Sequence, residues 1–136
     1  MSVILERVGF APDYVNYVES LDMQSRLHAE VAARARQNTI LLLEHEPVIT
    51  AGKRTEDHEY PTDRSTPVVK IDRGGKLTWH GPGQLTGYPI LKLPEPLDVV
   101  AYVRLLEEII MNVLAQLGIK GERVEGRSGV WIRSEE

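Results

Sequence analysis

Between Asp13 and Gln37 the sequence contains neither Gly nor Pro, and this long uninterrupted segment constrains the fold more than any other feature of the chain. Gly and Pro are the residues that most destabilise a helix interior, so their absence over this length favours one long helix. Pro12 stands where a missing N–H costs little, which predicts a helix start at residues 11–13, and Asn38 predicts the end. Apolar side chains recur along the segment at helical spacing, namely Tyr14, Tyr17, Val18, Leu21, Leu27, Val31 and Ala35.

Short apolar runs bounded by turn-forming residues predict the strands. They cover residues 2–9, 39–45, 48–50, 67–71, 88–93, 119–124 and 129–133, and the run 39–45 suits a strand buried on both faces. A second amphipathic helix is predicted from Asp98, a suitable N-cap, to Gly118, a natural stop. Its apolar face carries Val103, Leu106, Ile110, Val113, Leu114 and Leu117. The order of elements predicts the α/β (α+β) class, with helices packed on a mixed β-sheet.

Composition excludes several classes of protein. The 136 residues fit a single domain over 1–136, and 16 Lys and Arg against 20 Asp and Glu give a formal net charge of −4. An acidic chain is a poor general binder of nucleic acid, which requires a basic surface. No apolar run reaches the roughly 20 residues needed to span a bilayer, and the N-terminus shows no secretory signal, so we expect a cytoplasmic protein without membrane contact. The chain contains no cysteine, which excludes disulfides and any thiol nucleophile within it.

The segment Arg73-Gly-Gly-Lys-Leu-Thr-Trp-His-Gly-Pro-Gly-Gln84 is the strongest candidate for a functional site. Glycines let a ligand approach the backbone closely, Arg73 offers a planar fork to a carboxylate or phosphate, and His80 is able to move a proton near neutral pH. The segment is not a phosphate loop or a dinucleotide fingerprint. The competing interpretation is a glycine-rich turn between two strands, with His80 hydrogen-bonded to backbone, and the local pattern alone does not separate the two.

Clusters of His with carboxylates at residues 44–46 and 56–59 suggest metal ligands, but neither cluster is favoured as a metal site. Neighbouring residues on a strand point to opposite faces, so Glu44, His45 and Glu46 are not expected to converge. Residues 56–59 fall in a polar loop and are expected to face water.

Three segments together resemble the lipoyl(octanoyl) transferase family, also called lipoate–protein ligase B. They are the stretch from Leu42 to Lys53, the string RGGxxTxHGPGQL at residues 73–85, and Tyr88-Pro89-Ile90. The resemblance extends over essentially the whole chain, including Gly129-Val130-Trp131 near its end.

The resemblance implies an enzyme that transfers an octanoyl group from octanoyl-acyl carrier protein to a lysine of a lipoyl domain, either in a 2-oxoacid dehydrogenase complex or in the glycine cleavage H protein. It implies the catalytic-domain fold of biotin and lipoate protein ligases, a cysteine thioester intermediate, a lysine that lowers the pKa of this cysteine, and no cofactor or metal. The implied substrate-binding residues are Arg73, Gly74, Gly75, Lys76, Leu77, Thr78, Trp79 and His80.

The lysine and cysteine of the family lie downstream of the region equivalent to residues 129–133. The chain ends at Glu136 without a cysteine, so we expect a C-terminally incomplete catalytic domain, either a fragment or a truncated gene product, that is inactive alone. Two alternatives stay open: an ATP-dependent lipoate or biotin ligase of the same fold, and a non-catalytic fragment that binds acyl chains or lipoyl domains. Acyl carrier proteins and lipoyl domains are typically acidic by the same resemblance, and the candidate residues for meeting them are Lys53, Arg54, Arg73 and Lys76.

Overall fold

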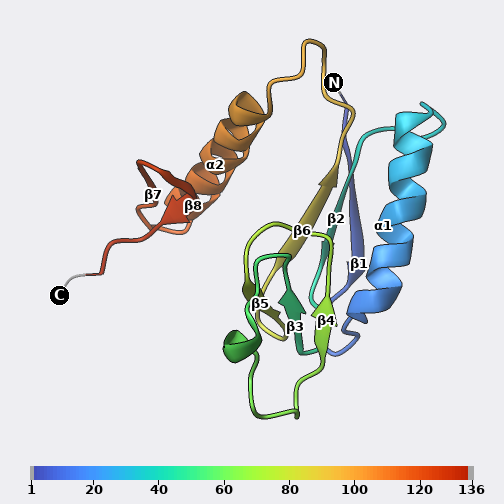
Figure 1. The fold of residues 1–136 in the computed structure, drawn as a ribbon. Coiled ribbons are helices and arrows are strands. Elements are labelled where there is room, and N and C mark those ends of the chain that lie inside the picture. Colours follow the sequence, from blue (N-terminus) through green and yellow to red (C-terminus); the bar gives the residue numbers. More distant parts are fainter. Residues whose placement is uncertain (1, 135–136) are drawn as a thin grey trace. The chain divides into compact units, whose positions relative to one another are not determined.

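The computed structural model describes residues 2–134, and its contacts divide the chain into two compact units, Met1–Lys92 and Leu93–Glu136 (Figure 1). The predicted mixed α/β architecture is confirmed, since the strands and helices follow one another along the chain in nearly the predicted order. The single domain expected over 1–136 stays a prediction.

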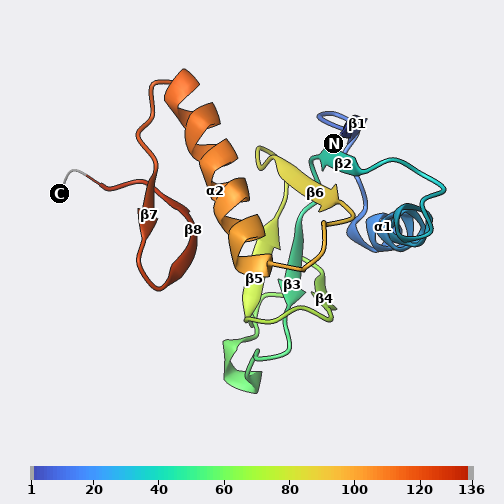
Figure 2. The same cartoon turned by 90° about the horizontal axis from the view of Figure 1, so that it is seen from above.

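A three-stranded sheet forms the centre of the first unit. Its strands are β1 (Ile4–Gly9), β2 (Thr39–Leu43) and β6 (Thr86–Ile90), with β2 in the middle, parallel to β1 and antiparallel to β6. The helix α1 (Tyr17–Ala32) covers one face of this sheet (Figures 1 and 2). Leu27 and Val31 of α1 pack against Leu41 and Ile90, and these four side chains form the buried core.

The helix α1 is shorter than predicted at both ends. Asn16 is the N-cap and accepts a hydrogen bond from the Glu19 backbone N–H, at 3.1 Å, so the helix begins four residues after Asp13. The preceding residues are extended because the Val15 backbone pairs with the chain at His45. The helix ends at Ala32, and Arg34 follows with a φ of 59°.

A second three-stranded sheet has β3 (Val48–Ala51) in the middle, parallel to β4 (Val68–Lys70) and antiparallel to β5 (Leu77–His80). The strand β5 lies inside the glycine-rich segment, which sequence analysis treated as a turn or binding loop. The structure also starts β6 at Thr86 and ends it at Ile90, whereas residues 88–93 were predicted. A short 3-10 helix, Asp57–Glu59, interrupts the predicted loop 52–67.

Backbone hydrogen bonds join the loop after β3 to the turn before β5. The N–H groups of Gly52, Lys53 and Arg54 donate to the carbonyls of Lys76, Arg73 and Gly75 respectively, at 2.8 to 3.0 Å. A Cβ atom at position 52 would lie 2.5 Å from the Gly75 carbonyl oxygen, so only glycine permits this approach. The two loops are thereby held as one piece of backbone.

The second unit consists of α2 (Val99–Gln116) and a hairpin of β7 (Glu122–Val124) and β8 (Arg127–Trp131). The predicted N-cap is confirmed, since Asp98 accepts from the Ala101 N–H at 2.9 Å. Glu107 on α2 is only 2% exposed and attaches the hairpin to the helix. Its carboxylate accepts from Arg104, from Arg123 at 3.2 Å, and from the Gly129 N–H at 2.8 Å.

Candidate functional site

The segment 73–80 forms a turn followed by β5, and its side chains divide between two faces. Successive residues of a strand alternate, so Leu77 and Trp79 lie on one face while Thr78 and His80 lie on the other. Trp79 is 46% exposed, and His80 is half-buried. The apolar side chains of Leu77 and Trp79 therefore face different surroundings from the imidazole of His80.

Arg73 stabilises its own turn. Its guanidinium donates to the Gly74 carbonyl at 2.8 Å, the Lys76 carbonyl at 3.0 Å and the Thr50 hydroxyl at 3.2 Å. A guanidinium carries five N–H donors, so these bonds leave only two for a ligand. Most donors of Arg73 therefore hold the backbone of its own turn, and fewer are left to bind a carboxylate or carbonyl of a ligand.

Four aromatic and imidazole rings gather on the His80 face, and we call them the ring cluster: Tyr17, His45, His80 and Tyr88. Tyr17 and His80 are stacked, with centroids 6.1 Å apart and planes 7° from parallel. The His45 centroid lies 5.2 Å from that of Tyr17 and 5.8 Å from those of both His80 and Tyr88. The cluster joins α1, β5, β6 and the residues that follow β2.

His45 is one of the residues of this cluster that sequence analysis did not assign to a site. Its side chain is fully buried, its Nδ1 lies 2.9 Å from the Val15 carbonyl oxygen, and its Nε2 lies 2.7 Å from the Tyr88 hydroxyl. A carbonyl only accepts, so Nδ1 carries the proton and Nε2 accepts from Tyr88. The sequence signal that points to its burial is strand alternation. Leu41, Leu43 and His45 are every second residue and lie on one buried face.

Burial favours the neutral forms of His45, Tyr88 and Tyr17. Desolvation lowers the pKa of His45, and the nearby His80 lowers it further, against the opposing effect of the Val15 carbonyl. Desolvation raises the pKa of Tyr88 to about 12, so its hydroxyl keeps the proton that it donates to His45. Burial also raises the pKa of Tyr17, while Arg73 acts in the opposite direction.

An open cleft of about 740 Å³ lies beside the ring cluster in the first unit. It is lined by side chains of α1, of β6 and of residues 70–73, including Tyr17, Leu21, Arg73, Tyr88 and Ile90. Of the predicted substrate-binding residues, only Arg73 lines it. Those residues stay a prediction, and the structure places the others along the turn and β5.

Residues 44–46 serve three separate purposes. The Glu44 carboxylate accepts from the Gly83 N–H at 2.8 Å and from the Ala11 N–H at 3.4 Å, which anchors the turn after β5. His45 uses both ring nitrogens within the cluster, and Glu46 is exposed. Within residues 2–134, no group of three or more His, Asp or Glu side chains is placed to hold a metal ion.

The basic residues predicted to meet acidic partners differ in their contacts. Lys53 pairs with Asp72, Lys76 pairs with Glu59, and Arg73 is engaged with its own turn. Arg54 is exposed and makes no ion pair within the described part of the chain. The role of these four residues stays a prediction.

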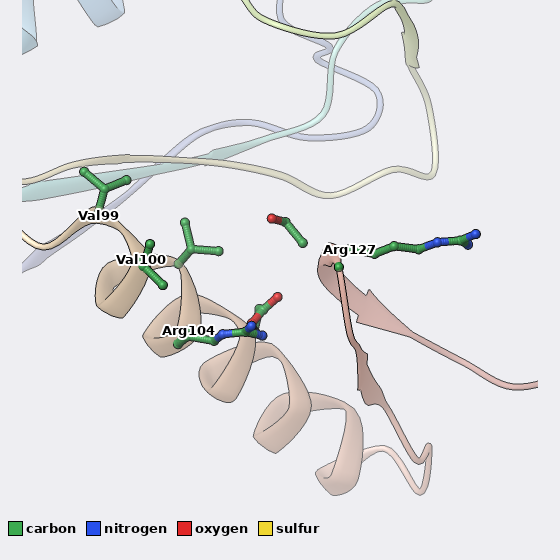
Figure 3. A pocket seen from close by; sticks show the side chains of 8 residues that line it. Val99, Val100, Arg104 and Arg127 are labelled. Atoms are coloured by element: carbon green, nitrogen blue, oxygen red, sulfur yellow. The ribbon is translucent and has the colours of Figure 1, made fainter.

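The second unit holds a smaller pocket of about 260 Å³ between α2 and the hairpin (Figure 3). Val99, Val100 and Val103 form its apolar side, and Arg104 and Glu107 form its charged side. Arg127, at the other wall, extends its side chain away from α2 (Figure 3). Its guanidinium carbon lies 5.5 Å from the centroid of the Trp131 ring. The Glu107 carboxylate at this pocket is already engaged by Arg104, Arg123 and the Gly129 N–H.

Residues 16–135 match the sequence model of the lipoyl protein ligase A/B catalytic domain. The chain belongs to this family. The ring cluster and the glycine-rich segment both fall within the residues that match this family.

The relatives of this lipoyl protein ligase A/B domain include octanoyltransferases. The sequence is 62% identical over 127 residues to an octanoyltransferase of Leifsonia xyli subsp. xyli, covering 93% of this chain and 56% of that protein. It is 59% identical over 126 residues to an octanoyltransferase of Streptomyces coelicolor, covering 93% of this chain and 47% of that protein. The chain thus spans about half the length of the curated relatives it matches.

Solved structures show the same fold. A bi-partite lipoate protein ligase of Thermoplasma acidophilum superposes with a TM-score of 0.64 at 17% identity, covering 92% of this chain and 49% of that one. A lipoate-protein ligase A bound with ATP gives a TM-score of 0.58 at 17% identity, covering 90% of this chain and 49% of that one. The predicted ligase-like fold is confirmed.

Neither helix within residues 2–134 has the length and apolarity that a membrane span requires.

Proposed function

We propose that this chain is part of an octanoyltransferase, which moves an octanoyl group onto a lysine of a lipoyl domain. One observation carries the proposal: the 62% identity to an octanoyltransferase over 93% of the chain. The family match over residues 16–135 supports the lipoylation chemistry, and a structural neighbour was solved in a study that includes its E2 lipoyl domain.

The finer steps of the proposal follow the resemblance. Octanoyl-acyl carrier protein donates the acyl group, a cysteine carries it as a thioester, and a lipoyl-domain lysine accepts it. The domain belongs to a 2-oxoacid dehydrogenase complex or to the glycine cleavage H protein, and the reaction takes place in the cytoplasm. Conversion of a thioester to an amide is downhill, so no nucleotide is required. The cysteine is not among these 136 residues, and we propose that another part of the enzyme supplies it.

The described residues fit the binding half of such a site. The cleft offers Leu21, Ile71 and Ile90 as apolar walls for an acyl chain. The adjoining turn offers glycine backbone, which lets a chain approach closely. The ring cluster supplies polar groups at fixed positions beside this cleft.

A chimera tests the proposed function. The matched region of the Leifsonia xyli octanoyltransferase is replaced by the matched residues of this chain, and the product is given octanoyl-acyl carrier protein and a lipoyl domain. Mass spectrometry of the domain should show octanoylation without ATP, at a rate within about tenfold of the parent enzyme. The parent enzyme and an enzyme-free mixture are the controls.

Two outcomes contradict the proposal. Modification that requires free octanoate or lipoate together with ATP, and exchange of pyrophosphate into ATP, would assign the chain to the ATP-dependent ligases. A folded chimera that binds octanoyl-acyl carrier protein without transfer would assign it to a binding role.

A further inference from the structure

The helix α2 buries a charged residue and leaves its apolar residues open to solvent. All 18 of its residues are described, and the buried one among them is Glu107. The apolar side chains of the helix are half-buried or exposed. An amphipathic helix of a globular protein normally turns its apolar side toward a core, so α2 lacks the contact that its sequence calls for.

The hairpin of β7 and β8 covers one side of α2 (Figure 2). Glu107 accepts hydrogen bonds from Arg123 and from the Gly129 N–H of the hairpin. Two turns further along the helix, Leu114 lies so close to Gly121 that a Cβ atom there would be 2.9 Å from its side chain. Glu107 and Leu114 therefore mark the side of α2 that the hairpin occupies.

An apolar stripe runs along a different side of the helix and continues to its C-cap. We call it the α2 stripe, and its residues are Leu105, Ile109, Ile110, Val113 and Leu117. They follow one another at spacings of three or four residues, so they are neighbours on successive turns, and they are 48% to 69% exposed. The charged residues between positions 105 and 117 are Glu107 and Glu108, and both lie on other sides of the helix.

An uncharged stripe of aliphatic side chains fits a permanent occupant. Contiguous exposed apolar surface marks an interaction site, and obligate interfaces resemble a domain core cut in half. The carrier protein and the lipoyl domain of the proposed reaction leave after each turnover, and the family resemblance implies that both are acidic. The stripe offers no cation to either of them. Its chemistry therefore favours a part of the enzyme itself.

The length of the relatives supplies such an occupant. The octanoyltransferase of Leifsonia xyli matches 93% of this chain, but the match covers only 56% of that protein. The remaining part belongs to the same polypeptide there, so it meets the helix at a high effective concentration. A second copy of this chain would instead have to associate from solution.

We propose that, in the complete enzyme, the α2 stripe is the contact surface for the part of the octanoyltransferase that lies outside the matched region. The inference rests on the proposed function, which names that enzyme. Aliphatic side chains of the added part cover the stripe and make α2 a core helix. The helix is then covered on two sides, by the hairpin and by the added part.

Single cysteines measure the burial of the stripe, because the chain contains no cysteine of its own. Val113→Cys lies on the stripe, and Asn112→Cys, which is exposed on another side of α2, is the matched control. Both variants are made in the 136-residue chain and in the chimera, and far-UV circular dichroism checks their folding. The rate of alkylation by N-ethylmaleimide is measured by mass spectrometry of the α2 peptide. Val113→Cys should react slower in the chimera by on the order of tenfold, and Asn112→Cys should react similarly in both proteins.

Equal alkylation rates of Val113→Cys in the two proteins would overturn the proposal. Alkylation of Val113→Cys that is already slow in the 136-residue chain would also overturn it, and sedimentation would then assign the cover to a second copy or to the chain itself. Val113→Lys gives an independent measure, since it should lower the Tm of the chimera but not that of the 136-residue chain. Asn112→Lys should change neither Tm. Protection of Val113→Cys in a chimera that transfers no octanoyl group would support this proposal while contradicting the proposed function.

Discussion

His45 and Tyr88 join the end of one strand to its antiparallel neighbour through a hydrogen bond of 2.7 Å between Nε2 and the phenol oxygen. The bond lies under α1, where Tyr17 covers the His45 ring. Tyr88 also packs against the apolar core of Leu27, Val31, Leu41 and Ile90.

Removal of the Tyr88 hydroxyl should destabilise the chain. Tyr88→Phe leaves the buried Nε2 of His45 without its donor, which costs about 1–3 kcal/mol of unfolding free energy. Urea unfolding followed by far-UV circular dichroism measures the change. Tyr14→Phe is the matched control, because Tyr14 is half-buried and makes no side-chain hydrogen bond among the described residues. Equal effects of the two substitutions would show that the His45–Tyr88 bond contributes nothing.

Stability should fall as the pH drops from 7 to 5. The pKa of His45 is lowered in the folded chain, so the unfolded chain binds the proton more readily. The loss begins as the pH falls through the ordinary value of about 6.5 and continues down to the folded pKa, at no more than about 1.4 kcal/mol per pH unit. His45→Gln should flatten the slope of unfolding free energy against pH over this range, whereas His58→Gln in the exposed loop should leave it unchanged. An unchanged slope in His45→Gln would contradict the prediction.

Glu107→Gln should loosen the hairpin from α2. The Gly129 N–H, Arg123 and Arg104 hold the pKa of Glu107 below its usual range, so its charged form contributes at neutral pH and the contribution is lost under acid conditions. Hydrogen exchange at the Gly129 amide should accelerate by on the order of tenfold. The neighbouring exposed Glu108 gives the control, Glu108→Gln. Unaltered exchange at Gly129 would mean that the carboxylate charge is dispensable.

Charge reversal at Arg54 should slow association with octanoyl-acyl carrier protein in the chimera. Arg54 makes no internal ion pair in the described chain, so Arg54→Glu should reduce the association rate several-fold at low salt and less at high salt. Lys53→Glu also breaks the pair with Asp72, and Arg26→Glu on α1 serves as a distant control. Stopped-flow measurement over a salt series gives the association rate of each variant. If Arg54→Glu left this rate unchanged at every salt concentration, Arg54 would be excluded from the interface.

The 136-residue chain by itself should not transfer octanoyl groups. It has no thiol, and the nucleophile that the family resemblance implies is a cysteine. Incubation with octanoyl-acyl carrier protein and a lipoyl domain should leave the mass of the domain at the enzyme-free level. Catalytic octanoylation above that level would reveal a nucleophile other than cysteine.

Local sequence patterns located most of the strands and both helices, because the periods of hydrophobic residues and the Asp98 cap act over short distances. The start of α1 was predicted too early, since the pairing of Val15 with His45 is a contact between distant parts of the chain. The strand β5 was missed because its residues pair with β3, and nothing near Leu77 indicates that partner. The glycine-rich segment pointed to His80, whereas its neighbours Tyr17 and His45 become visible only when β2, β5 and α1 meet.

The contact between Gly52 and Gly75 separates two kinds of glycine that look alike in the sequence. At position 52 any side chain collides with backbone, whereas a Cβ at Gly74 meets no atom within 4 Å. A saturation library in the chimera, read once for folded protein and once for octanoyl transfer, would therefore sort the positions. Position 52 would be depleted in both readings, and depletion of position 74 in the second reading alone would mark the place where an outside molecule, not the chain, occupies the space.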